Sequence, residues 1–278
     1  MTNLPLPRPL PLSPLETTQV DKQLFLPGID EFMRAMPNHI ARSSLFAPVA
    51  PGRKKTHNET VLVSRSDAVI TFSGVQLDEA QADVWMQAIH EASKHELGKP
   101  VVINSAAFLR AIGRAKSGDS YKWLHRAFKD LAKGLLIIET FKAGKLKHSI
   151  GKTRMLRMID EFSYDEITEE YSFSVDPRWS ALYANREFAL IDWEKRLSLG
   201  RGQDMAKAMQ RLLATSSDER QAFNLDWLKK KLEYTGRMRD FRAAIARAME
   251  ELLRVELITK WEIGKNIKGN DKLTVLVV

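Results

Sequence analysis

The chain has 278 residues, of which 44% are hydrophobic, and a formal net charge of +8 at pH 7. That hydrophobic fraction supports one large or two smaller folded domains and argues against global disorder. The absence of cysteine excludes disulfides and thiolate metal sites. No apolar run reaches the roughly 20 residues that a membrane helix needs, so we expect a soluble cytoplasmic protein without a membrane partner.

The charge is segregated along the chain. Residues 104–157 hold 13 Lys and Arg against 3 Asp and Glu, and residues 195–278 hold 18 against 11. Residues 158–194, between these blocks, hold 2 against 10. Two basic blocks separated by an acidic one favour two anion-binding surfaces, and DNA is the obvious polyanion. Basic residues that only keep the chain soluble would explain the net charge but not its segregation.

Residues 1–56 are predicted to form a flexible, proline-rich tail, because nine of the 11 prolines lie there. Alternating Leu and Pro near the start favours extended backbone and opposes helix. The run RSSLF, which ends in Leu45 and Phe46, has the form of a peptide that docks its apolar pair into a partner's pocket. Packing of this segment onto its own domain is the alternative.

Residues 57–187 are predicted to form a first domain. The expected elements are strands at 60–63, 68–72 and 101–103, helices at 79–95 and from 104 or 105 to about 112, a helix at 120–133, a strand at 135–141, and short strands between 155 and 175. Apolar residues of the 120–133 helix point inward, which leaves Lys122, Arg126 and Lys129 on other faces. A basic turn around Gly144 predicts a hairpin after the 135–141 strand.

Residues 188–278 are predicted to form a second domain. The expected elements are a strand at 188–193, helices at 203–214, 225–233 and 238–255, and strands at 257–263 and 272–278. Asn224 is a good N-cap, and Thr235-Gly236 separates the last two helices. The longest helix has apolar residues on one face and Arg239 and Arg242 on the other.

A helix, a tight turn, a basic helix and a basic hairpin, in that order, predict a winged helix-turn-helix. In this motif the second helix enters the major groove of DNA and the hairpin contacts phosphate. A similar order after residue 104 predicts a second copy, so the expected fold class is α+β, with two winged-helix domains in tandem after the tail. A helical hairpin and β-ribbon with an ordinarily solvated basic face is the alternative.

Catalytic and metal-binding motifs are lacking. Gly151-Lys152-Thr153 lacks the earlier Gly that a phosphate-binding loop requires, because Leu146 occupies that position. The six histidines show no paired ligand spacing. A carboxylate cluster indicates a solvated acidic hairpin rather than a metal site: Asp165, Glu166, Glu169 and Glu170. We therefore expect no enzymatic activity, no cofactor and no metal.

Three segments resemble the TrfA family of plasmid replication initiators: VSRSDAVITFSG at 63–74, QADVWM at 81–86 and SYKWL at 120–124. The likeness covers roughly residues 58–278. It implies binding to direct repeats (iterons) at a plasmid origin, opening of an AT-rich region and recruitment of the host's replicative helicase. It also implies a bacterial, plasmid-encoded protein that binds the origin as a monomer and whose self-association controls copy number.

The family also has a tail motif for the replicative sliding clamp, of the form Gln-Leu-Ser/Asp-Leu-Phe. In this chain Ser44, Leu45 and Phe46 match its end, whereas Arg42 and Ser43 replace the Gln and the first Leu. The apolar pair is kept and the amide contact is lost. The resemblance therefore implies weak or absent clamp binding through Leu45 and Phe46.

Each domain is expected to place one helix in a major groove, about one helical turn apart. The expected DNA-binding residues are Lys122, Arg126 and Lys129 in the first domain and Arg237, Arg239, Arg242, Lys265 and Lys268 in the second. The three arginines of the 237–242 segment would read guanine edges, and the two lysines of the hairpin would hold phosphate. Charge alone also permits binding to single-stranded AT-rich DNA. A winged-helix repressor that binds one operator, or a protein whose basic faces meet an acidic partner, remains possible at this point.

Overall fold

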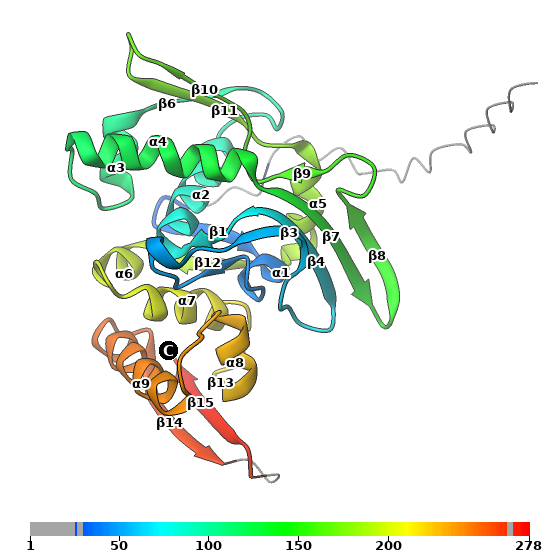
Figure 1. Cartoon of the computed structure of the whole chain (residues 1–278), viewed down its shortest axis with the longest axis vertical. Helices are drawn as coiled ribbons and strands as arrows, with labels where there is room; N and C mark the ends of the chain where they lie inside the picture. The colour runs from blue at the N-terminus through cyan, green and yellow to red at the C-terminus, as the bar shows by residue number, and fades with distance from the viewer. Residues whose placement is uncertain (1–25, 27–29, 266–268) are drawn as a thin grey trace, which may run out of the picture.

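The computed structural model describes residues 26, 30–265 and 269–278. The described chain has two hydrophobic cores, one formed by residues between Leu26 and Trp193 and the other by residues between Leu199 and Val275. Figure 1 shows the first lobe in the upper part of the view and the second below it, with α7 between the two. No helix in these ranges is long and apolar enough to cross a membrane.

The elements of the first lobe follow in chain order: β1 (Met33–Pro37), α1 (Asn38–Ala41), β2 (Phe46–Ala47), a 3₁₀ turn (Pro51–Arg53), β3 (Thr56–Val61), β4 (Ala68–Val75), β5 (Leu77–Asp78), α2 (Glu79–Ala92), β6 (Val101–Asn104), α3 (Ser105–Ala111), α4 (Gly118–Lys133), β7 (Leu135–Lys142), β8 (Lys145–Ile150), β9 (Leu156–Arg157), β10 (Asp160–Asp165), β11 (Glu170–Ser174), a 3₁₀ turn (Pro177–Trp179), α5 (Ser180–Tyr183), a 3₁₀ turn (Ala184–Arg186) and β12 (Phe188–Asp192). The elements that follow are α6 (Trp193–Ser198), α7 (Asp204–Leu213), β13 (Arg220–Asn224), α8 (Leu225–Lys231), α9 (Met238–Arg254), β14 (Ile258–Lys265) and β15 (Asp271–Val277).

Each lobe contains one winged-helix unit of the same topology. In the second lobe the unit consists of α7, β13, α8, α9, β14 and β15, and its strands are hydrogen-bonded in the order β13-β15-β14. In the first lobe the corresponding elements are α2, β6, α3, α4, β10 and β11, with the strand order β6-β11-β10. The predicted α+β fold with two winged-helix domains in tandem is confirmed.

Local details repeat between the two units as well. Asn104 Oδ1 accepts a hydrogen bond from Ala107 N at 3.0 Å, and Asn224 Oδ1 accepts one from Asp226 N at 2.8 Å, so the same residue type caps α3 and α8. Both helices are seven residues long. The residue that ends each turn has a positive φ, which is 67° at Gly113 and 52° at Glu233.

The basic hairpin expected to be the first wing is not the wing. β7 and β8 belong to a separate sheet in the order β3-β4-β7-β8, inserted between α4 and the true wing, β10–β11. Pairing of β4 with β7 holds the insertion to the first lobe. Apolar residues alternate on these two strands, so that Ile70 pairs with Ile138 and Phe72 with Leu136, and all four are buried. Linear order alone could not distinguish this inserted hairpin from a wing.

The tail expected over residues 1–56 does not extend to residue 56. β1 pairs antiparallel with β12, in register from Met33↔Asp192 to Pro37↔Phe188, and β2 pairs parallel with β5. Pro37 ends β1, Pro48 follows β2 and Pro51 begins a 3₁₀ turn, positions where a missing N–H costs little, so the apolar residues between them can enter the core. Residues 1–25 and 27–29 lie outside the described residues.

The strand predicted at 188–193 to begin the second domain is β12, which pairs with β1 and completes the first lobe. Ala189, Ile191 and Trp193 belong to the first core, whereas Leu199 begins the second. We therefore place the domain boundary between Trp193 and Leu199 rather than at residue 188.

Candidate nucleic-acid interface

α4 presents a continuous basic stripe to solvent. Its buried side chains are Leu124, Ala127, Phe128 and Leu131. Its exposed cations are Lys122, Arg126, Lys129 and Lys133. Spacings of four, three and four residues put these cations on one face of the helix. The three predicted residues of the first domain therefore lie together, and Lys133 extends the stripe by one turn.

Aromatic stacking fixes the rotation of α4 about its axis. The Phe128 ring lies 5.3 Å from the Phe162 ring and 5.2 Å from the Tyr171 ring, centroid to centroid, with near-parallel planes. Because Phe162 and Tyr171 belong to β10 and β11, the wing sheet covers the apolar side of the helix and leaves the cations outside. Burial, and then the charge of Lys129, lowers the pKa of His125, so this imidazole adds no charge to the stripe at neutral pH.

α9 has a different distribution of charge. It buries Phe241, Ile245, Ala248, Met249 and Leu252. Arg237 and Arg239 are exposed at its N-terminal end, and Arg239 is 93% exposed. Ala243 on the exposed face is small enough for close approach to a ligand surface, and the C-terminal half of the helix has no net charge, because Glu250 and Glu251 balance Arg247 and Arg254. A recognition helix contacts base edges with its N-terminal residues, which is where these arginines lie.

Arg242 holds α9 to the second wing. Its Nη1 lies 2.5 Å from Asp271 Oδ2 at the start of β15, and the two side chains are 42% and 24% exposed. This ion pair makes Arg242 a positioning group for the hairpin. Lys265, at the end of β14, is exposed, and Lys268 lies outside the described residues.

Arg247 was not among the predicted site residues. It is exposed on α9, one turn after Ala243, and makes no hydrogen bond or ion pair with any residue the structure describes. Helical spacing from the buried Phe241 and Ile245 was the signal that could have placed it on the outer face.

The two wings carry opposite charge. The tip of β10–β11 contains Asp165, Glu166 and Glu169, and Asp165 Oδ1 accepts hydrogen bonds from Ile167 N at 2.8 Å and Thr168 N at 3.2 Å. Ile167 is 94% exposed at this tip. Carboxylates repel phosphate, so this wing does not supply a phosphate contact. The basic tip of the first lobe belongs to β7–β8 instead, where Ala143 and Gly144 have φ of 50° and 76° and Lys142 and Lys145 flank them.

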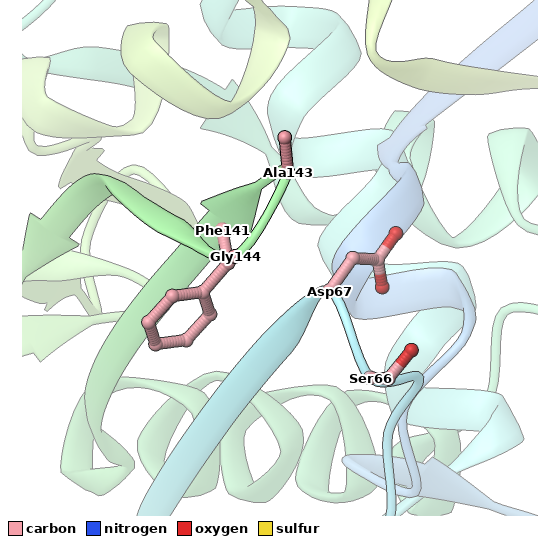
Figure 2. Close-up of a pocket in the computed structure, with 5 residues that line it drawn as sticks. All are labelled: Ser66, Asp67, Phe141, Ala143 and Gly144. Atoms are coloured by element: carbon pink, nitrogen blue, oxygen red, sulfur yellow. The ribbon is translucent and has the colours of Figure 1, made fainter.

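A hollow of about 420 Å³ lies beside the β7–β8 turn. Figure 2 shows Phe141, Ala143 and Gly144 on one side of it and Ser66 and Asp67 on the other. Asp67 is the one charged residue among these five lining residues. Such a lining lacks the converging donors that an anion or a nucleotide requires, so it does not indicate a small-molecule site.

Leu45 and Phe46, the predicted docking pair, are fully buried. The Phe46 carbonyl accepts a hydrogen bond from Arg211 Nη2 at 3.1 Å, and the Arg211 guanidinium lies 5.6 Å from the Phe46 ring centroid. Phe46 therefore contributes to the contact between the two lobes, and Leu45 belongs to the core of the first lobe. The prediction that they dock a sliding clamp is wrong for this fold, because an apolar pair in the core presents no surface to a partner.

Comparison with known proteins agrees with this architecture. The family model described as TrfA protein matches residues 17–267. The chain belongs to the TrfA family. The plasmid replication initiator protein TrfA of Escherichia coli is 25% identical over 166 residues, which are 59% of this chain and 42% of that protein. The match thus spans less than half of the length of this relative.

The fold of this TrfA-family chain is also similar to solved structures. Domains 2 and 3 of RctB superpose with a TM-score of 0.55 at 12% identity, covering 87% of this chain and 98% of that one. A second structure of the same two domains superposes with a TM-score of 0.53, also at 12% identity, and the match covers 87% of this chain and 97% of that one. At this identity the likeness concerns the fold, and it extends across both lobes.

Proposed function

We propose that this protein initiates plasmid replication by binding direct repeats at an origin, promoting the opening of an adjacent AT-rich region and recruiting host replication proteins, the replicative helicase among them. The observation that supports this most strongly is the pair of winged-helix units with the same strand order, each exposing cations on its third helix, α4 or α9. Membership of the TrfA family supports the same function. We propose that the protein acts in the bacterial cytoplasm, without catalytic chemistry.

The site residues divide into two groups in this proposal. Arg237 and Arg239, at the N-terminal end of α9, read base edges, and Lys265 and Lys268 hold phosphate. Lys122, Arg126 and Lys129 place α4 against a second groove of the same duplex. Arg242 acts through its ion pair with Asp271, which sets the hairpin against α9.

Partner contacts are proposed only where the fold leaves room for them. Binding to single-stranded AT-rich DNA agrees with the exposed basic surfaces. Self-association is proposed from membership of the TrfA family alone. Contact with the sliding clamp through Leu45 and Phe46 is not proposed, because both side chains are buried.

A selection experiment tests the DNA-binding function. The full chain is incubated in parallel with two sets of duplexes, a random pool and fragments of its plasmid origin. The sequences that it binds are then cloned from each set. We expect enrichment of one repeated sequence, with an affinity that falls steeply between about 50 and 200 mM salt while the preference for the repeat persists. Equal affinity for unrelated duplexes at every salt concentration would contradict the proposal.

A replication assay separates the initiator from a repressor. A plasmid that carries the selected repeats and an AT-rich segment should replicate only when this protein is supplied. Repression of a reporter without replication would assign the chain to the repressor class instead.

A further inference from the structure

A cluster of buried charges joins the two lobes. It consists of Glu79 and Asp83 on α2, Arg196 on α6, and Lys207 and Arg211 on α7; we call it the interdomain ion cluster. The side chains of Glu79, Arg196 and Arg211 are 0% exposed. Every carboxylate of the cluster comes from the first lobe, and every cation follows Trp193.

The geometry within the cluster is closely specified. Arg196 Nη2 lies 3.0 Å from Glu79 Oε2, and Arg196 Nε lies 2.5 Å from Asp83 Oδ1. Arg211 donates to both carboxylate oxygens of Glu79, and Lys207 Nζ lies 2.8 Å from Asp83 Oδ2. Forked guanidinium–carboxylate pairs fix orientation as well as distance, so each lobe restricts rotation of the other.

Burial makes these contacts costly to break. Desolvation opposes ionisation of Glu79, but the charges of Arg211 and Arg196 outweigh it and hold the pKa of this carboxyl below its ordinary value. Removing one member leaves its partners charged and unpaired in a site shielded from solvent. The covalent connection alone would be permissive, because Gly200 and Gly202, with φ of 61° and 80°, lie between α6 and α7.

We propose that the interdomain ion cluster holds the two winged-helix units at one angle and thereby fixes the separation between DNA grooves that the chain can occupy at once. The cluster then determines repeat spacing without touching DNA. α2 and α7 are the first helices of the two units, and α4 and α9 pack on them. A contact that fixes the angle between α2 and α7 therefore also fixes the angle between α4 and α9. This inference rests on the proposed function for its DNA consequence but not for its structural claim.

The structural claim is tested without DNA. The chain has no cysteine, so spin labels attach only at introduced positions; His95→Cys and Ser217→Cys place one on an exposed site of each lobe. Double electron–electron resonance should give one narrow distance distribution for this parent. Glu79→Gln should broaden that distribution at least about twofold, because it removes the charge that both arginines share. A distribution as narrow and as centred as that of the parent would overturn the proposal.

A matched control separates the interface from a general loss of stability. Asp176 is also buried and also holds two arginines, Arg154 at 2.9 Å and Arg178 at 2.6 Å, but all three lie in the first lobe. Asp176→Asn should leave the distance distribution narrow. If Glu79→Gln fails to fold, Lys207→Gln, at a position 13% exposed, replaces it; an unchanged width in that variant would also overturn the proposal.

The DNA consequence uses the duplex selected by the parent, with 1 to about 5 base pairs inserted between its two footprinted blocks. An insertion of about half a helical turn should weaken binding of the parent roughly tenfold or more, and that of Glu79→Gln by less than about threefold. The same spacing penalty in both proteins would contradict the role in spacing. If the parent selects no duplex, the proposed function fails, while the resonance measurement still decides whether the cluster holds the lobes together.

Discussion

The two winged-helix units share a topology but differ in where they carry charge. The first has four cations along the exposed face of α4 and an acidic wing, whereas the second has Arg237 and Arg239 at the N-terminal end of α9, Arg247 farther along that helix and Lys265 at the end of β14. A stripe along a helix matches the even spacing of backbone phosphates, and a basic helix end matches base edges in a groove. The comparison predicts that the first unit supplies affinity and the second supplies sequence preference.

The largest expected effect concerns the aromatic stack that sets α4 against its wing. Phe128→Ala should destabilise the first unit by about 3–5 kcal/mol, because the fully buried ring packs against Phe162, Tyr171 and Phe173. Urea unfolding would measure this change. Phe32→Ala, at a position 70% exposed, is the control and should change stability by less than about 0.5 kcal/mol. A similarly small loss for Phe128→Ala would show that the stack does not fix the helix.

The division of roles predicts different binding defects for α9 and α4. Arg239→Ala should reduce discrimination between the selected repeat and its single-base variants by about 1–3 kcal/mol. Lys129→Ala should weaken all duplexes alike and reduce the slope of log K against log salt by about 1. Fluorescence anisotropy across a salt series distinguishes the two outcomes. If the two variants lost the same discrimination and showed the same change in salt dependence, the proposed division into an affinity unit and a sequence-reading unit would be wrong.

The two units also differ at the last residue of their second helix, which is Ala111 in α3 and Lys231 in α8. Lys231 provides a test of pH dependence, because it is fully buried and its Nζ has no hydrogen-bond partner among the described residues. Burial, and then the charge of Arg211, lowers the pKa of Lys231 to about 7, with Glu79 acting in the opposite direction.

An unfolded lysine binds its proton as pH falls through 10.5, but folded Lys231 does so only near 7. The free energy of unfolding should therefore decrease as pH falls from about 10.5 to about 7 and then lose its dependence on this group. Lys231→Met should remove that decrease and stabilise the protein at pH 7 by about 1–2 kcal/mol. Thermal melts at pH 7 and pH 9 measure the effect, and a lower Tm for the variant at pH 7 would contradict it.

The smallest expected effect comes from making the first wing resemble the second. Glu166→Lys combined with Glu169→Lys should strengthen binding to unrelated duplexes by less than about 1 kcal/mol at low salt, with no change at high salt. A matched double substitution to Gln should give a smaller gain. If neither variant gains affinity at any salt concentration, the acidic wing lies away from DNA altogether.

Sequence patterns located most of the elements of both units. The N-cap Asn224, the start of α3 at 104 or 105, the apolar spacing of α4 and α9, and the Thr235-Gly236 break are local signals, because a cap or a helical face involves residues only a few positions apart. The basic residues of both helices followed from the same periodicity. The two-unit organisation followed from the repeated order of elements, although that order took β7–β8 for the first wing.

Tertiary structure decided what those patterns could not. Whether β7–β8 or β10–β11 is the first wing depends on which strand pairs with β6, and that strand is β11. The pairing of Ile70 with Ile138, which places β7 in another sheet, joins residues far apart in the sequence. Leu45 and Phe46 resembled an exposed docking peptide until the structure placed them in the core. The interdomain ion cluster joins residues more than 100 positions apart, such as Glu79 and Arg211. Such pairings depend on long-range packing, for which a single sequence contains no periodic signal.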